Sequence, residues 1–284
     1  MLSTLIDKVV DNSQTNGTIL MQILLANAKI MRNEVKLTDD IALTVPAFIN
    51  EAEKIAAEMA QMDVGELARQ LHCSTAIAAE NWERFRNFTI ATPMPAIMAY
   101  NGQAYKHLRA TSLSAEALGF ASRHLWITCF LYGLLRPTDA VVPYRMENDV
   151  KLDLTDDAPL NSYWRAVAVD AFGNTATDVL VDSVRADDGT LVHLSTEEYE
   201  HLFHWQRVCR ELKVVQPAFY VRRGEKLSVQ AVWAKTCRGA MVRFILENKI
   251  TDVESLRTFS YEGFNFAFAD ENTNPQRLVF IRET

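Results

Sequence analysis

The stretch that decides the fold is Met21-Gln-Ile-Leu-Leu-Ala26, a mostly apolar run that leads directly into the triplet Asn27-Ala28-Lys29. A short apolar run that ends in polar residues is typical of a buried strand whose end displays functional groups. The twenty residues before it are polar and irregular by comparison. We therefore expect one domain over residues 21–284 and take residues 1–20 as an N-terminal extension, with Met21 as a possible native start.

The composition is that of an ordinary globular protein, since 49% of the 284 residues are hydrophobic and 23% are charged. The chain contains no linker-like segment, which favours a single compact domain. It has no apolar run of the roughly 20 residues that a membrane-spanning helix needs, and its first residues make a poor secretory signal. The four cysteines are scattered, as expected for reduced thiols. We expect a cytoplasmic protein with no membrane partner.

The net charge of −7 argues against nucleic-acid binding when it is taken over the whole chain. Its distribution is uneven, however. The segment from 207 to 243 holds nine Lys or Arg against two Glu, which makes it +7 and leaves −14 for the remainder. Such asymmetry indicates one face that suits anionic partners.

Helices and strands are predicted to alternate without a regular βαβ rhythm, which gives an α/β (mixed α+β) fold. Between 46 and 88 the apolar spacing indicates three short helices, with a break at Asp63-Val64-Gly65 and Ser74 as an N-cap. Apolar runs further along the chain are predicted to be strands, at 96–100, 125–131, 179–184, 191–194, 214–220, 227–233, 264–268 and 277–281.

Basic side chains follow several of these strands, in loops where a rigid scaffold usually displays functional groups. Arginine grips phosphate with a planar fork of donors, and lysine supplies a point charge. The predicted DNA- or anion-binding residues are Lys29, Arg136, Arg145, Lys235, Arg238 and Arg243. Internal pairing with Asp139 stays an alternative for Arg136, and pairing with Glu147 stays one for Arg145.

An enzyme that acts on a nucleotide or another phosphorylated small molecule in the same cleft is the alternative function. Its candidate catalytic groups are Glu198 and Tyr199 as acid or base and Ser195 as nucleophile. The pattern Ser-x-x-Glu from 195 to 198 also fits a capping box at the start of a helix, which we favour for Ser195. No motif names a reaction, and no cofactor is predicted.

A metal site is the third possibility, because His201 and His204 lie three residues apart with Glu197 and Glu200 before them. An exposed, charged helix end explains the same spacing, and no metal is predicted.

Several of these clusters carry a resemblance. The run Phe130-Leu-Tyr-Gly-Leu-Leu-Arg-Pro-Thr-Asp139, followed by Pro143-Tyr-Arg145, is similar to the signature of the YaaA peroxide-stress family. Leu194-Ser-Thr-Glu-Glu-Tyr199 and Ala234-Lys-Thr-Cys-Arg-Gly239 match further elements of that family in order. The resemblance runs from Met21 to the end of the chain.

The resemblance implies a bacterial cytosolic protein that limits free iron and oxidative DNA damage under peroxide stress. It also implies one α/β domain with a basic cleft and a helix-hairpin-helix-like element, here within 46–88, and binding to DNA. The hairpin at 62–66 departs from the family because it has one glycine and two acids, which repel phosphate. We therefore expect phosphate contacts from the cleft, with little sequence specificity. The preferred DNA structure and the oligomeric state are left open.

Overall fold

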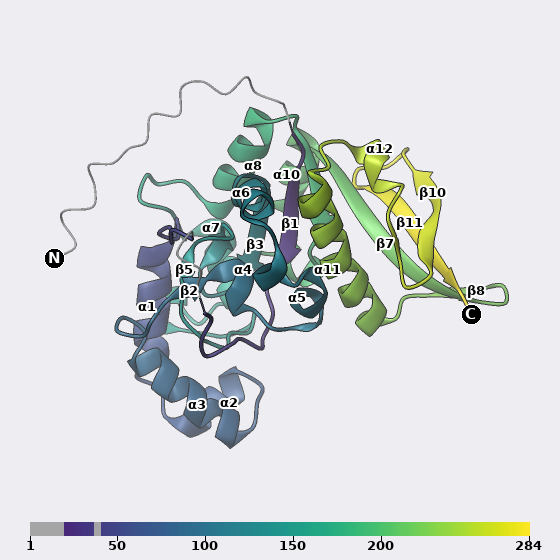
Figure 1. The fold of residues 1–284 in the computed structure, drawn as a ribbon. Coiled ribbons are helices and arrows are strands. Elements are labelled where there is room, and N and C mark those ends of the chain that lie inside the picture. The colour runs from purple at the N-terminus through teal and green to yellow at the C-terminus, as the bar shows by residue number, and fades with distance from the viewer. Residues whose placement is uncertain (1–19, 37–40) are drawn as a thin grey trace.

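The structure is a computed structural model, and it describes residues 20–36 and 41–284. The predicted extension 1–20 therefore falls outside the described residues except for Leu20. Within the described residues, nine strands form one sheet, and helices pack around it (Figure 1). The buried apolar side chains join into one continuous core. The predicted mixed α/β fold in a single domain is confirmed.

The centre of the sheet is parallel and its edges are antiparallel. The order of the strands is β4-β3-β1-β6-β7-β11-β10-β9, with β8 paired to β7, and the strands from β3 to β11 run parallel. Parallel strands are usually covered on both faces, and β1, β3 and β6 are accordingly buried almost throughout. The strands are β1 Gln22–Ala26, β3 Leu125–Cys129, β4 Gly133–Leu135, β6 Thr190–Leu194, β7 Lys213–Arg223, β8 Lys226–Ser228, β9 Ser260–Tyr261, β10 Phe264–Asp270 and β11 Gln276–Glu283, and a separate pair is formed by β2 Met94–Pro95 and β5 Ala140–Val141.

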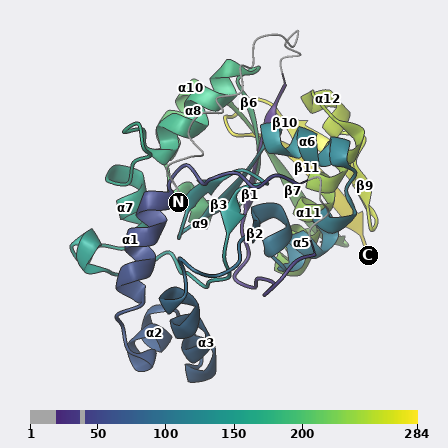
Figure 2. The same ribbon diagram turned by 60° about the vertical axis from the view of Figure 1, so that its left-hand side comes forward.

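Helices cover both faces of this sheet. Figure 2 shows the central strands between α7, α8 and α10 on one side and α5, α6 and α11 on the other. The helices are α1 Ile49–Met59, α2 Val64–Gln70, α3 Thr75–Arg86, α4 Ala96–Ala99, α5 Gln103–Leu108, α6 Ala115–His124, α7 Leu160–Ala166, α8 Ala176–Ala186, α9 Glu197–Glu200, α10 Trp205–Glu211, α11 Ala231–Asn248 and α12 Val253–Leu256, with short 3-10 turns at Ala110–Ser112 and Asp153–Thr155.

Three predicted strands are wrong. Residues 96–99 form α4, because a four-residue apolar run fits a buried helical turn as well as a strand. Residues 179–184 lie in α8, which begins with a capping box in which Thr175 and Asp178 bond each other's backbone N–H groups. The strand predicted at 227–233 ends at Ser228, and its second half begins α11.

The three successive helices predicted between 46 and 88 are present as α1, α2 and α3, and α2 and α3 project from the body of the molecule (Figure 1). Ser74 caps α3 as predicted, since its side chain accepts a hydrogen bond from the N–H of Ile77. The residues 64–66 of the predicted hairpin instead form the first turn of α2, where the Asp63 carboxylate accepts from the Glu66 N–H. A helix-hairpin-helix-like element is therefore not established by this arrangement.

Strand β1 is the point at which the chain changes direction across the sheet. The connection from β1 leads to β3 on one side, and the chain later returns to place β6 on the other side. In open parallel sheets, such a switch of strand order leaves a crevice beyond the carboxyl ends of the two diverging strands. The carboxyl ends of β1 and β6 are Ala26 and Leu194.

Candidate functional site

A pocket of about 320 Å³ lies at this switch point, beyond the carboxyl ends of β1 and β6. We call it the switch-point pocket. Its lining comprises Leu25, Ala26, Asn27, Ala28, Lys29, Ile30, Gly102, Gln103, Ala104, Tyr105, Leu194, Thr196, Glu198, Tyr199, Lys235 and Arg238. The segment after β1, the start of α5, the segment after β6 and one face of α11 thus meet around it.

Two glycines allow these elements to approach so closely. A Cβ on Gly102 would lie 2.5 Å from the Cβ of Ala28, and a Cβ on Gly239 would lie 1.8 Å from the carbonyl oxygen of Ala104. Both distances are far shorter than ordinary contacts, so the start of α5 is held against the β1 loop and against α11 only because both positions lack a side chain.

Arg238 and Lys235 are the basic groups of the pocket that have no hydrogen bond or ion pair within the described residues. Among residues 20–36 and 41–284, no acid and no hydrogen-bond acceptor engages the Arg238 guanidinium, and burial lowers the pKa of Arg238 with no opposing influence. A guanidinium that is partly removed from water and unpaired costs folding free energy, part of which an anionic ligand would recover. Lys235 lies on the same face of α11, three residues earlier, and is exposed.

Lys29 and Arg145 share one buried acid. The Glu147 side chain is 4% exposed and accepts from the Lys29 ammonium and, at 2.8 Å, from Nη2 of Arg145. The internal pairing that was left open for Arg145 is therefore present. Nε of Arg145 also donates to the Leu71 carbonyl oxygen, which ties the turn between α2 and α3 to the loop beside the pocket.

Two further predicted residues line the pocket from α9. Burial raises the pKa of the Glu198 carboxyl, while the charges of Lys29 and Lys235 act in the opposite direction. The Tyr199 hydroxyl donates to the side-chain oxygen of Asn27, whose amide donates in turn to the Tyr144 hydroxyl at 3.3 Å. This bridge by Asn27 was not predicted, because its partners lie more than a hundred residues away.

Ser195 lies behind the pocket and not in its lining. Its hydroxyl is buried within 3.3 Å of the Thr128 hydroxyl. The predicted capping box from Ser195 to Glu198 is wrong, because α9 begins at Glu197 with Thr196 as its N-cap residue and no side-chain cap. Ser195 is drawn into the core because β6 is buried along its whole length.

The structure does not bring Arg136 to the pocket. Its guanidinium stacks 3.2 Å above the Trp126 ring and donates to the Arg123 carbonyl oxygen and the Ser183 hydroxyl, near the amino end of β3. Its link to Asp139 runs through the backbone N–H and not through the guanidinium. Burial raises the pKa of Asp139 to about 6.

Arg243 is likewise placed elsewhere. It donates to the carbonyl oxygens of Leu108 and Arg109 and pairs with Glu247, so that it fastens the end of α5 to α11. Of the six predicted basic residues, the pocket therefore collects Lys29, Lys235 and Arg238, with Arg145 beside it.

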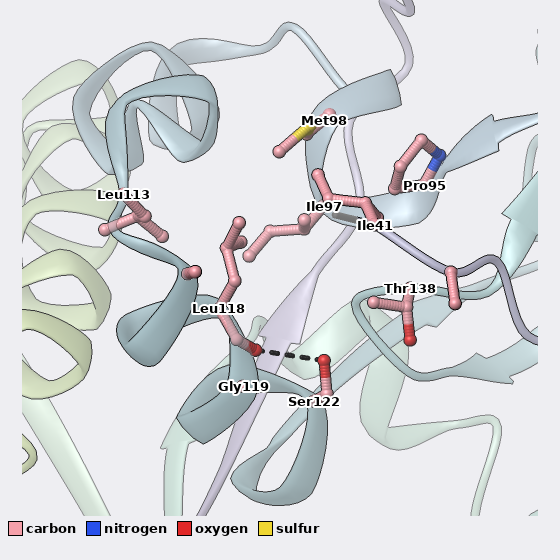
Figure 3. Close-up of a pocket in the computed structure, with 11 residues that line it drawn as sticks. Ile41, Pro95, Ile97, Met98, Leu113, Leu118, Gly119, Ser122 and Thr138 are labelled. Atoms are coloured by element: carbon pink, nitrogen blue, oxygen red, sulfur yellow. Dashed lines mark hydrogen bonds between the residues drawn. The ribbon is translucent and has the colours of Figure 1, made fainter. Parts of the chain in front are cut away.

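A second pocket, of about 370 Å³, has a different character. Figure 3 shows Ile97, Leu113 and Leu118 around it, and all eleven described residues that line it are uncharged. Ile41, one of the lining residues, directly follows the undescribed residues 37–40. The described residues of its lining offer no charged group for an anion, whereas Lys29, Lys235, Arg238 and Glu198 line the switch-point pocket.

The fold and this site define an α/β protein with a pocket at the switch point of its parallel strands, lined by Lys29, Lys235, Arg238 and Glu198 among others. Residues 21–270 match the family described as "Peroxide stress protein YaaA", and the chain belongs to this family. The chain is 41% identical to a UPF0246 protein of Bacteroides thetaiotaomicron, over 92% of this chain and 98% of that protein. It is 34% identical to a UPF0246 protein of Porphyromonas gingivalis, over 93% of this chain and 100% of the relative. A UPF0246 protein of Rickettsia rickettsii is 31% identical, over 92% and 100%.

Membership of this family supports a role related to peroxide or oxidative stress. In the part of the chain that the structure describes, no helix is both long enough and apolar enough to cross a membrane. The same residues contain no group of three or more His, Cys, Asp or Glu side chains placed to hold a metal ion.

Proposed function

We propose that this protein binds DNA in the cytosol during peroxide stress, and that its switch-point pocket holds a phosphate of the DNA backbone. The observation that carries the proposal is the Arg238 guanidinium, which is half-buried and unpaired within the described residues while it lines the pocket. An arginine of this kind is suited to a bidentate contact with phosphate. Lys29 and Lys235 add positive charge in the same lining.

The proposed affinity for DNA decreases as the salt concentration rises and depends little on the DNA sequence. Phosphate contacts release counterions, so that the affinity falls steeply as salt rises. The net charge of −7 opposes DNA at long range, so the local cations must carry the attraction. We propose that the link to iron-driven damage consists in the protection of bound DNA, which requires no metal site in the protein.

Fluorescence anisotropy with labelled single-stranded, duplex and branched DNA across a salt series tests the proposal. Arg238→Gln is expected to reduce affinity about tenfold or more, because a charge-assisted hydrogen bond is lost. Arg210→Gln is the matched control. Arg210 is an exposed arginine on α10, and its substitution removes the same charge at a position outside the pocket lining. Absence of binding at low salt, or equal losses in the two variants, would overturn the proposal.

A phosphorylated small molecule is the second candidate, favoured by the size and shape of the site. A volume of about 320 Å³ falls in the range of roughly 300–1,000 Å³ that is common for small-molecule pockets. Glu198, with its raised pKa, would then be the acid or base and Tyr199 a neighbouring hydroxyl, while Ser195 stands behind the lining. Turnover of nucleotides by the wild type, abolished in Glu198→Gln, would favour this reading.

A further inference from the structure

The switch-point pocket contains an acidic side chain, Glu198, and a basic side chain, Arg238, and neither has a hydrogen bond or ion pair within the described residues. Glu198 is half-buried, and the influences on its pKa are burial and the charges of neighbouring groups, with no hydrogen bond to its side chain among the described residues. Within the part of the chain that the structure describes, the Arg238 guanidinium has no ion pair and no hydrogen-bond acceptor. The two groups reach the pocket from different elements, Glu198 from α9 and Arg238 from α11.

A ligand that satisfies both groups must carry an anion for Arg238 and N–H donors for Glu198. An ionised carboxylate accepts hydrogen bonds only, through two oxygens side by side. If one phosphate binds Arg238, a second phosphate beside the ionised Glu198 would be repelled by its negative charge. A plain run of backbone phosphates therefore leaves Glu198 without a partner, and a partially desolvated acid without a partner is costly.

The rest of the lining is largely apolar. The partly or fully exposed residues Ala28, Ile30 and Ala104 contribute to it, together with Tyr105, whose hydroxyl donates to the Ala26 carbonyl oxygen. Apolar and aromatic surfaces of this kind suit the faces of a flat heterocycle. A nucleotide combines such a ring with a phosphate.

We infer that the switch-point pocket binds one unpaired nucleotide, with its phosphate at Arg238 and a guanine edge at Glu198. Guanine is selected because its N1–H and its exocyclic amino group present two adjacent donors, which match both oxygens of a carboxylate. Adenine and cytosine place an acceptor beside their donor, and uracil or thymine flanks one N–H with two carbonyl oxygens. These acceptors face the carboxylate unfavourably. The inference rests on the proposed function, since it requires a phosphate at Arg238.

The charge state of Glu198 gives the inference its pH signature. Lys29 and Lys235 lower its pKa, Glu147 and Asp149 raise it, and burial raises it most. The preference for guanine is therefore expected to be full at high pH and to weaken as Glu198 takes up a proton, because a protonated carboxyl matches the donor–acceptor edges of adenine and cytosine as well.

Isothermal titration calorimetry with GMP, AMP, CMP and UMP tests the inference, because the four share one phosphate and differ in the base. GMP is expected to bind about tenfold more tightly than the others, the contribution of one charge-assisted hydrogen bond. Glu198→Gln is expected to bring GMP to the level of the others and to leave those unchanged within about twofold. Glu197→Gln, an exposed neighbour on the same helix, is the control and should keep the preference. Thermal melts of both variants check folding.

The outcomes separate the inference from the proposed function. Equal affinities for the four nucleotides, or a guanine preference that survives Glu198→Gln, would overturn the inference and leave phosphate binding intact. DNA binding that depends on Arg238, with no binding of any mononucleotide, would do the same. Loss of both DNA and nucleotide binding would remove the proposed function and the inference together.

Discussion

Substituting Gly239 by Ala is expected to destabilise the protein, although alanine is the better helix former. In α11 the new Cβ would lie 1.8 Å from the Ala104 carbonyl oxygen and 2.5 Å from the carbonyl carbon. Since non-bonded heavy atoms settle at about 3.5 Å, α5 must retreat by roughly 1.5 Å. Overpacking against the backbone is expected to lower the free energy of unfolding by about 3 kcal/mol. The higher helix propensity of alanine is expected to raise it by about 1 kcal/mol. The net loss of about 2 kcal/mol corresponds to a fall in Tm of roughly 4–8 °C for a chain of this size.

Gly119 in α6 provides the matched control. A Cβ there meets nothing closer than Nη1 of Arg123, at 4.0 Å. Gly119→Ala is therefore expected to raise stability by about 0.5–1 kcal/mol. Differential scanning calorimetry of both variants, with urea unfolding as a second measure, compares the two. Equal or greater stability of Gly239→Ala would show that α5 and α11 are not in the close contact on which the pocket geometry depends.

Arg136→Ala is expected to lower stability by about 2–3 kcal/mol, through loss of the ring contact and two hydrogen bonds, and to leave DNA affinity unchanged; a thermal melt beside an anisotropy titration checks both. Asp139 has a folded pKa of about 6 against an ordinary value of 3.8, so its contribution to stability is present at acid pH and is lost as the pH rises through about 6. Urea unfolding between about pH 4 and 7 should show this decline, of up to about 3 kcal/mol, in the wild type and not in Asp139→Asn. Glu147→Gln is expected to cost about 1–3 kcal/mol, because Lys29 loses its charged partner, and to tighten phosphate binding at low salt; an unchanged affinity would mean that Lys29 does not face the ligand.

Local signals in the sequence predicted much of the fold. The apolar run from 21 to 26 contains β1, and Ser74 caps α3 by accepting a hydrogen bond from the N–H group three residues later. Prediction failed where two local signals compete. The β-branched residues of α8 suggested a strand, but the capping box at Thr175 and burial at helical spacing decide for a helix.

The sequence predicted which types of residue form the candidate site, but it did not predict which individual residues lie in it. Arg136, Arg238 and Arg243 are alike in the sequence, as basic residues near the ends or within predicted elements. In the structure Arg136 stacks on Trp126, Arg243 bonds the end of α5, and Arg238 is the one that lines the pocket. The contacts that place these three arginines involve residues at least 10 positions away along the chain. A short sequence pattern does not contain such residues.

The sequence by itself determined that strands end in polar loops and that basic groups follow them, because burial, capping and turn formation depend on a few neighbouring residues. Only the tertiary structure decided which loops meet. The order β3-β1-β6 opens the crevice at Lys29, and the close approach at Gly239 brings α11 with Arg238 to it. The physical reason is that these contacts join segments up to two hundred residues apart, whose burial free energy depends on the packing of the whole sheet and not on any local preference.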